Sequence, residues 1–230
     1  SKRLPGKSML DLAGEPLVGR ILERVKRCEE VDKIVLTIPD QSSDNILSRL
    51  AKKYSITVSR GPENDLLRRY FRASIDNNAD IVVRLPADNV TPEPYEIDKI
   101  IKFHKSRKER GFSTNLSEIF NSGYPDGIGA EVFDFSFFED IFKKQPSLMQ
   151  KEHIHLNFFN YNTKMPVDNE WCPVKTIICP EEYSRPELIL DVNTLDQYLF
   201  MKSLYESLYP KNPFFSIKDI INWYDNVYIK

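Results

Sequence analysis

Two cations flank a tight turn in the first seven residues, SKRLPGK. Arg3 and Lys7 stand on either side of Leu-Pro-Gly. Gly6 lets the backbone come close to an anion, and Pro5 stiffens the turn. Arg3 can make a bidentate contact with a phosphate, while Lys7 supplies a mobile point charge. The pattern is a candidate polyphosphate site with Arg3 and Lys7 as its catalytic cations. Composition by itself favours the alternative, a solvated basic terminus.

Two acidic residues each follow an apolar, strand-like run. Asp88 follows residues 81–85, and Asp191 follows residues 188–190. Ligands of parallel sheets collect at the carboxyl ends of strands. Magnesium usually takes one or two protein carboxylates and fills its other positions with phosphate oxygens and water. We therefore expect Asp88 and Asp191 to converge on one Mg²⁺, with Asp88 also a candidate catalytic residue. The alternative for each is a turn or a helix cap.

Weaker candidates lie further along the chain. Asp126 stands in a Tyr-Pro-Asp-Gly turn shortly before Glu131, and Glu152 and His153 open the run Glu-His-Ile-His. The spacing of the two histidines is not the helical HExxH spacing, so we do not expect a metal there. On local grounds Asp126 is simply a good turn residue. Two arginines that end apolar runs are candidate pocket cations, namely Arg60 and Arg84.

Helix-like and strand-like segments alternate along the chain. Apolar residues recur either at helical spacing or in short continuous runs. We expect helices over 16–28, 44–54, 64–75, 97–104, 194–208 and 217–223, and strands over 33–38, 56–59, 80–85, 174–178 and 187–191. Alternation of this kind predicts an α/β fold with a mostly parallel sheet that is covered by helices on both faces. We expect one domain, 1–230, with an irregular substrate or dimerisation insertion at 123–174.

The opening turn lacks the strand that usually precedes it. A parallel sheet of this type normally begins with a strand that leads into such a loop. The sequence leaves open whether upstream residues supply this strand or the fold starts differently.

Composition narrows the classes of partner. The 230 residues carry a formal net charge of -2, so the overall field does not attract nucleic acid or anionic lipid. Three widely spaced cysteines fit neither a disulfide framework nor a paired metal site. No apolar run approaches the roughly 18 residues of a membrane span, and no leader-like segment precedes the fold. We therefore expect a soluble cytoplasmic protein that binds neither nucleic acid nor membranes.

The ordered set of motifs resembles one family. RLPGK, RGPENDLLRRY, VVRLPADN, YPDGIGAEVF, KEHIHLNF and LDVNT are similar to segments of the spore-coat polysaccharide cytidylyltransferase-like family, and together they span nearly the whole chain. That family is related to the acylneuraminate and 3-deoxy-manno-octulosonate cytidylyltransferases. The resemblance implies a Rossmann-like nucleotidyltransferase fold of glycosyltransferase type A. It also implies transfer of CMP from CTP to a sugar or sugar acid for glycan biosynthesis, with Mg²⁺ as cofactor and a homodimer as the assembly.

The resemblance also implies roles for individual residues. Arg3 and Lys7 would hold the CTP phosphates, Asp88 would bind magnesium or nucleotide, and Asp191 would complete the metal site. Three further residues match positions near the nucleotide, namely Arg60, Asp65 and Arg84. Four match the sugar side of the pocket, namely Asp126, Glu131, Glu152 and His153. Asn89 stands where relatives often have Cys or Glu, which leaves the subfamily open.

Two other functions remain compatible with the sequence. A glycosyltransferase that consumes a nucleotide sugar can use the same fold. That class commonly presents an acid-any-acid metal motif, and the run Ala-Asp-Asn at Asp88 departs from it. The other alternative is a module that binds a nucleotide without catalysis.

Overall fold

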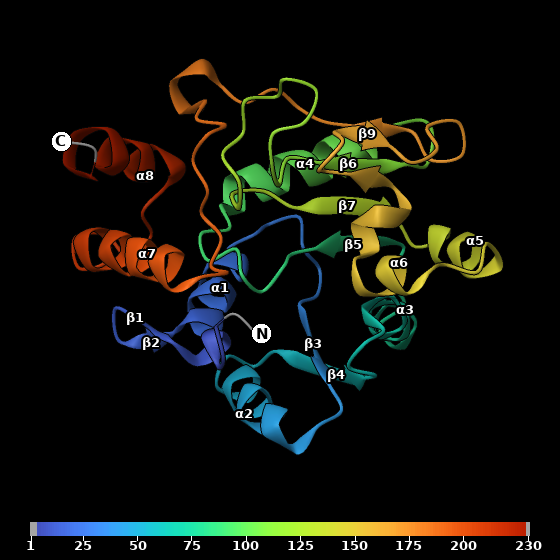
Figure 1. Ribbon diagram of the computed structural model, residues 1–230, viewed down its shortest axis with the longest axis horizontal. Helices are drawn as coiled ribbons and strands as arrows, with labels where there is room; N and C mark the ends of the chain where they lie inside the picture. Colours follow the sequence, from blue (N-terminus) through green and yellow to red (C-terminus); the bar gives the residue numbers. More distant parts are fainter. Residues whose placement is uncertain (1–3, 229–230) are drawn as a thin grey trace.

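The computed structural model describes residues 4–228, and Arg3 therefore lies outside the described residues. Its strands form one four-stranded sheet, one parallel pair and two short hairpins (Figure 1). The four-stranded sheet contains β5 (Ile81–Arg84), β6 (Phe112–Thr114), β7 (Glu131–Asp134) and β10 (Val174–Lys175), in the order β10-β6-β7-β5. The parallel pair is β3 (Val35–Pro39) with β4 (Thr57–Gly61), and the hairpins are β1 (Asp11–Leu12) with β2 (Glu15–Pro16) and β8 (Phe159–Asn160) with β9 (Met165–Pro166).

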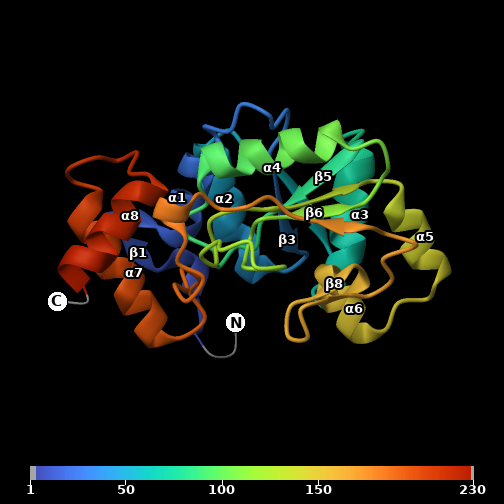
Figure 2. The same cartoon turned by 90° about the horizontal axis from the view of Figure 1, so that it is seen from above.

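Helices surround these strands (Figures 1 and 2). The α-helices are α1 (Leu17–Val25), α2 (Asn45–Lys53), α3 (Leu66–Asp76), α4 (Pro94–Ser106), α5 (Phe137–Lys143), α6 (Leu148–Glu152), α7 (Leu195–Leu208) and α8 (Ile217–Trp223). Short 3-10 turns cover Lys7–Met9, Ser42–Asp44, Ile154–Asn157 and Glu181–Tyr183, and a π-helical turn covers Tyr224–Tyr228. The helices and strands expected in the first half of the chain are thus confirmed as elements, with bounds shifted by a few residues.

The direction of β7 corrects the expectation of a mostly parallel sheet. The pairs β3–β4 and β10–β6 are parallel, but β7 runs antiparallel to both β5 and β6. Parallel neighbours need a crossover connection, usually a helix. The chain enters β7 from the irregular segment 115–130, which contains no helix, and it therefore returns antiparallel to β6. The segment expected as a strand over 187–191 forms only isolated bridges.

Most aromatic residues of the range 123–174 belong to the core. Phe133 of β7 is fully buried, as are Phe137 and Phe158, and their rings pack together with that of Phe112. The range includes β7, a strand inside the four-stranded sheet, together with α5, α6 and the β8–β9 hairpin. The high Phe content of this region is therefore explained by packing. No helix within residues 4–228 is long and apolar enough to cross a membrane.

Candidate functional site

Lys7 connects the amino-terminal turn to two distant segments. Gly6 adopts a left-handed conformation (φ 69°), and the following 3-10 turn begins at Lys7. The Lys7 ammonium donates hydrogen bonds to Asp88 Oδ2 at 3.1 Å, to the Val192 carbonyl at 2.8 Å and to Asn193 Oδ1 at 3.2 Å. Its side chain is 15% exposed. The turn thus places a partly buried cation against the first strand-end acid.

Three carboxylates come together because the segment 188–192 lies between two others. Asp191 bridges Asn89 in antiparallel fashion, and Ile189 bridges Asp126 in parallel. The Val192 amide donates to the Asp88 carbonyl at 2.9 Å. Asp88, Asp126 and Asp191 therefore stand on three adjacent extended segments at the carboxyl end of β5. The structure brings Asp88 and Asp191 near each other, and it adds Asp126, which the sequence analysis assigned to the sugar side. Their sharing of one metal ion stays a prediction.

The crowding of carboxylates changes their acidity. Burial, with the nearby charges of Asp126 and Asp88, raises the pKa of Asp191 to about 6, although the Lys7 ammonium opposes the shift. Burial also raises the pKa of Asp126, and Asp88 and Glu131 add to this effect. Mutual repulsion of this kind is relieved when a cation binds. The site is therefore electrostatically suited to a divalent metal.

The donor set fits magnesium. Carboxylate oxygens are hard ligands, and Mg²⁺ needs only one or two of them when a phosphate supplies others. Within residues 4–228 no group of three or more His, Cys, Asp or Glu side chains is arranged to hold a metal. An ion held by Asp88 and Asp191, with phosphate oxygens completing its coordination, therefore stays a prediction.

Asp191 is oriented by two neighbours that the sequence analysis did not single out. Asn193 Nδ2 donates to one carboxylate oxygen and Gln197 Nε2 donates to the other, the latter at 2.9 Å. The same Gln197 closes the capping box of α7, because its Oε1 accepts from the Thr194 amide at 3.0 Å. The sequence could have indicated the role of Gln197, because Thr194 followed by Gln three residues later is a capping-box pattern.

A second polar cluster is formed by residues of the antiparallel strands β5 and β7. Arg84 at the end of β5 forms a buried ion pair with Glu131 of β7, and the register of the two strands places these residues opposite each other. The other Glu131 oxygen accepts from the Tyr161 hydroxyl at 3.1 Å. Arg84 Nε is buried without a hydrogen-bond partner among the described residues.

His155 lies near the Arg84–Glu131 pair, and His153 lies next to His155. The ring of His155 lies 5.9 Å from that of His153 and 5.2 Å from that of Tyr161, between centroids. Burial lowers the pKa of His155 to about 4, with Arg84 and His153 contributing and Glu131 opposing. His155 is therefore neutral at neutral pH. The sequence analysis assigned only His153 to the site, and the structure adds His155 and Tyr161 next to it.

The remaining predicted residues lie in local structures. Arg60 of β4 donates to Asn45 Oδ1 at 2.7 Å and to Ser48 Oγ at 2.8 Å, which fixes the start of α2. Asp65 caps α3 by accepting from the Arg68 amide at 2.8 Å. Glu152 is exposed at the end of α6. Their predicted contacts with nucleotide and sugar stay predictions.

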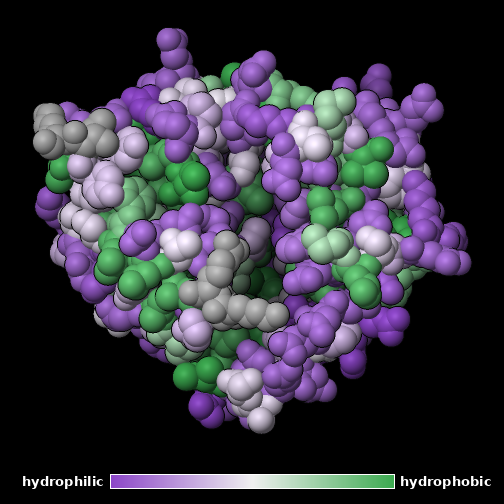
Figure 3. Space-filling view, in the orientation of Figure 1, coloured by the Kyte–Doolittle hydropathy of each residue, from purple (hydrophilic) through white to green (hydrophobic). Residues whose placement is uncertain are grey.

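The face drawn in Figure 3 is hollowed near its middle, with apolar residues visible in the depth.

Comparisons with known proteins agree with this architecture. An uncharacterized protein of Methanocaldococcus jannaschii, MJ1063, is 29% identical over 154 residues, and the match covers 67% of this chain and 60% of that protein. The spore coat polysaccharide biosynthesis protein SpsF of Bacillus subtilis is 26% identical over 211 residues, which cover 90% of this chain and 82% of SpsF.

A solved structure extends the similarity to the whole fold. A cytidylyltransferase from Leptospira borgpetersenii superposes with a TM-score of 0.85 at 25% identity, covering 98% of this chain and 89% of that one. The predicted Rossmann-like nucleotidyltransferase fold is thus confirmed. The family model described as cytidylyltransferase matches residues 1–206. Because this match spans most of the chain, the protein belongs to the cytidylyltransferase family.

Proposed function

We propose that this protein transfers the CMP group of CTP to a sugar or sugar acid and releases pyrophosphate. A sugar hydroxyl or sugar phosphate oxygen attacks the α-phosphorus and loses its proton. The bond from the α-phosphorus to the bridging oxygen breaks, and pyrophosphate leaves. The similarity to SpsF, a spore coat polysaccharide biosynthesis protein, supports a product used to build a surface glycan.

Catalysis in this proposal is mainly positioning and neutralisation of charge. Lys7 binds the phosphates and, with Arg3, stabilises the charge that develops on the leaving pyrophosphate. Asp88 and Asp191 hold Mg²⁺, which when bound withdraws charge from the phosphate oxygens. Asp126 lies between this site and the buried Arg84–Glu131 pair, where the sugar would bind.

One observation carries the proposal, namely the contact of Lys7 Nζ with Asp88 Oδ2 at 3.1 Å. A basic turn and a strand-end acid that are 81 residues apart meet at one point. A nucleotide with its magnesium supplies both the anion for Lys7 and the cation for Asp88. Lys7 and Asp88 compensate each other's charge in the structure, so a bound triphosphate would replace Asp88 as the partner of Lys7.

The test measures pyrophosphate release from CTP with a panel of sugars and sugar acids. Lys7→Ala and Asp88→Asn should each lower the rate by about 100-fold or more. Lys53→Ala is a matched control, because Lys53 pairs with Glu15 and its side chain is 59% exposed. Asp76→Asn is the control for the carboxylate change, since Asp76 lies on the surface in a pair with Arg72.

Three outcomes would count against the proposal. Wild-type rates of pyrophosphate release in both site variants would show that Lys7 and Asp88 do not take part in catalysis. Release of a nucleoside diphosphate from a nucleotide sugar, instead of pyrophosphate from CTP, would identify a glycosyltransferase. A thermal-shift screen of the four nucleoside triphosphates with Mg²⁺ in which no nucleotide stabilises the protein would exclude nucleotide binding itself.

A further inference from the structure

A cluster of charged side chains lies where the sugar of the proposed reaction would bind. Ion pairs join Lys7 to Asp88 and Arg84 to Glu131, and the charges of Asp88 and Glu131 act on Asp126. The acceptor cluster consists of these residues and one more acid, namely Lys7, Arg84, Asp88, Asp126, Glu131 and Asp191. With all six side chains ionised, the acceptor cluster carries two more negative than positive charges.

Both cations of the acceptor cluster already have a carboxylate partner. Lys7 Nζ lies 3.1 Å from Asp88 Oδ2, and a bound triphosphate would take this cation. Only Arg84 is then left for a second ligand, and its Nη1 donates to Glu131 Oε2. His155 adds no positive charge at neutral pH, because burial lowers its pKa to about 4.

The register of three strands holds Glu131 against Arg84. Glu131 of β7 lies opposite Arg84 of β5 on one side and opposite Thr114 of β6 on the other. The Tyr161 hydroxyl donates to Glu131 Oε1 at 3.1 Å and lies 3.1 Å from Thr114 Oγ1. Glu131 is fully buried. An anion that took Arg84 would leave this carboxylate buried without a counter-charge, which is strongly unfavourable.

Asp126 favours a hydroxyl over an anion. Its carboxylate is half-buried and accepts a hydrogen bond from Ser117 Oγ. A carboxylate has about four lone-pair positions, so it can accept further hydrogen bonds from a sugar hydroxyl. Burial and the charges of Asp88 and Glu131 raise the pKa of Asp126, so negative charge is already disfavoured there. A ligand carboxylate would donate no hydrogen bond and would add to this repulsion.

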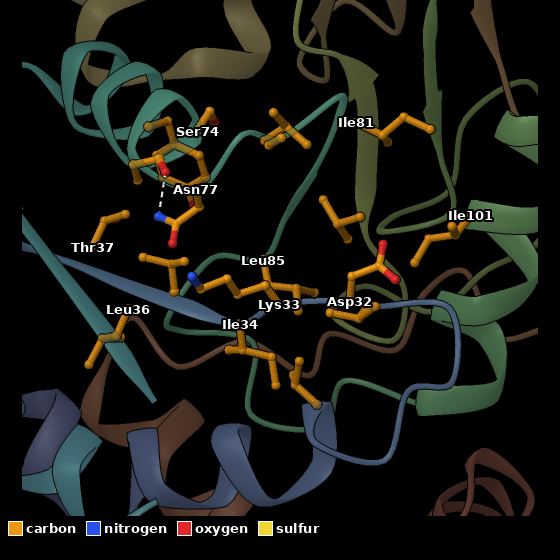
Figure 4. Close-up of a pocket in the computed structure, with 18 of the residues that line it drawn as sticks. Asp32, Lys33, Ile34, Leu36, Thr37, Ser74, Asn77, Ile81, Leu85 and Ile101 are labelled. Carbon is orange, nitrogen blue, oxygen red and sulfur yellow. Dashed lines mark hydrogen bonds between the residues drawn. The ribbon is translucent and has the colours of Figure 1, made fainter. Parts of the chain in front are cut away.

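The cavity next to Asp88 does not change this balance of charge. It has a volume of about 400 Å³, and apolar residues such as Ile34, Ile81 and Leu85 form most of its lining (Figure 4). It reaches Ala87, the residue before Asp88. Acidic residues outnumber basic ones among its charged lining residues, which are Glu30, Asp32, Lys33, Asp80 and Lys105. The cavity therefore offers no excess of positive charge to an acidic acceptor.

We propose that the acceptor of the CMP group is a neutral sugar, which is recognised through hydroxyl groups at Asp126 and beside the Arg84–Glu131 pair. A sugar that carries a carboxylate or a phosphate at this place is rejected, because it meets carboxylates there and no cation that is free to pair with it. This inference rests on the proposed function and narrows its substrate to one chemical class.

The test offers pools of acceptors to the wild-type chain with CTP and Mg²⁺ at neutral pH. One pool contains neutral sugars, another contains uronic and other sugar acids, and the last contains sugar phosphates. We expect pyrophosphate release with the neutral pool to be at least about 100-fold faster than with either anionic pool. Equal or faster release with an anionic pool would overturn this inference and leave the proposed function intact. No release with any pool would contradict the proposed function and this inference with it.

Glu131→Gln tests the role of the buried pair, because it frees the charge of Arg84. The rate with the anionic pools relative to the rate with the neutral pool should rise by about tenfold or more. This ratio is taken within one variant, so a loss of folded protein cancels. Glu93→Gln is the matched control, since Glu93 forms a buried ion pair with Arg24 at 3.0 Å outside the acceptor cluster. An unchanged ratio in Glu131→Gln, or an equal rise in Glu93→Gln, would overturn the inference.

Discussion

The raised pKa of Asp191 makes the free energy of unfolding depend on pH. In the folded protein its pKa is raised to about 6 from an ordinary value of 3.8, mainly by burial and by Asp126 and Asp88. Between these pH values the folded state binds more protons than the unfolded state, so the free energy of unfolding falls as pH rises. The penalty is complete above about pH 6. In the proposed function, this loss of stability keeps a charged carboxylate available for Mg²⁺.

Asp191→Asn should remove this pH dependence. From pH 4 to pH 7 the variant should gain roughly 1–2 kcal/mol in the free energy of unfolding relative to the wild type, measured by urea denaturation without metal. The amide keeps one acceptor oxygen and therefore loses one of the two hydrogen bonds donated by Asn193 and Gln197. This loss costs the same at both pH values, so only the difference between them is interpreted. Asp196→Asn, at an exposed position on α7, should show no such gain. A parallel pH profile for wild type and Asp191→Asn would contradict the raised pKa.

Neutralising one partner of the Arg84–Glu131 pair should lower the free energy of unfolding substantially. Glu131 is fully buried and Arg84 is 8% exposed, so Glu131→Gln leaves a buried guanidinium without its counter-charge. We expect a loss of about 3 kcal/mol in the free energy of unfolding. The exposed Arg72–Asp76 pair is the control. Asp76→Asn should change the free energy of unfolding by at most about 0.5 kcal/mol.

The double variant Arg84→Met with Glu131→Leu separates charge from packing. Removing both charges should restore most of the stability that Glu131→Gln loses, because no unpaired ion is left buried. Denaturation in urea measures all three variants. If Glu131→Gln is no more destabilising than Asp76→Asn, the pair is not a structural support of β5 and β7.

At the scale of elements, the start of α7 serves both the helix and the site. Gln197 caps the helix with its Oε1 and holds Asp191 with its Nε2. The start of α8 has the same capping box, formed by Ser216 and Asp219, without a contact to the acidic site. The two helices therefore provide a matched comparison between capping and positioning.

Gln197→Ala and Asp219→Ala should each lower the free energy of unfolding by about 1 kcal/mol, since each removes one half of a capping box. Only Gln197→Ala should also weaken the stabilisation of the protein by CTP with Mg²⁺ in a thermal-shift titration. The reason is that Asp191 then loses one of the two donors that orient it. Equal loss of nucleotide stabilisation in both variants would show that Gln197 acts through helix stability alone.

At the scale of the whole molecule, the end formed by α6 and the β8–β9 hairpin carries exposed apolar side chains. Leu148 and Met149 are 80% and 58% exposed, and Met165 is 60% exposed. The aromatic residues of the range 123–174 are largely in the core, whereas these aliphatic side chains, together with Val167, are exposed to a second copy. The predicted homodimer is therefore proposed to form through α6 and the hairpin.

Light scattering checks this assembly. The wild-type chain should have the mass of a dimer, and the double variant Leu148→Glu with Met149→Glu should have that of a monomer, because two charges would face the interface. Leu195→Glu with Leu199→Glu on α7 is the control, since these leucines are 57% and 51% exposed. A wild-type monomer, or a dimer that only the α7 variant disrupts, would exclude this surface.

The sequence by itself determined the features that depend on neighbours along the chain. The apolar periodicity predicted α1 to α4 and β3 to β5, and the run Leu-Asp-Val-Asn-Thr predicted the acid before α7. The turn before Lys7 follows from Pro5 and Gly6, whose backbone preferences are local. The resemblance of ordered motifs indicated the family, which the match over residues 1–206 confirms.

Only the tertiary structure decided which of these features meet. Lys7 contacts acceptors 81 and 185 residues away, and Asp126 joins Asp88 through an extended segment that no periodicity marks as its partner. The antiparallel course of β7 likewise depends on pairing between distant strands. Such contacts are absent from a sequence pattern because the pattern records local preference, whereas convergence depends on the path of the whole chain.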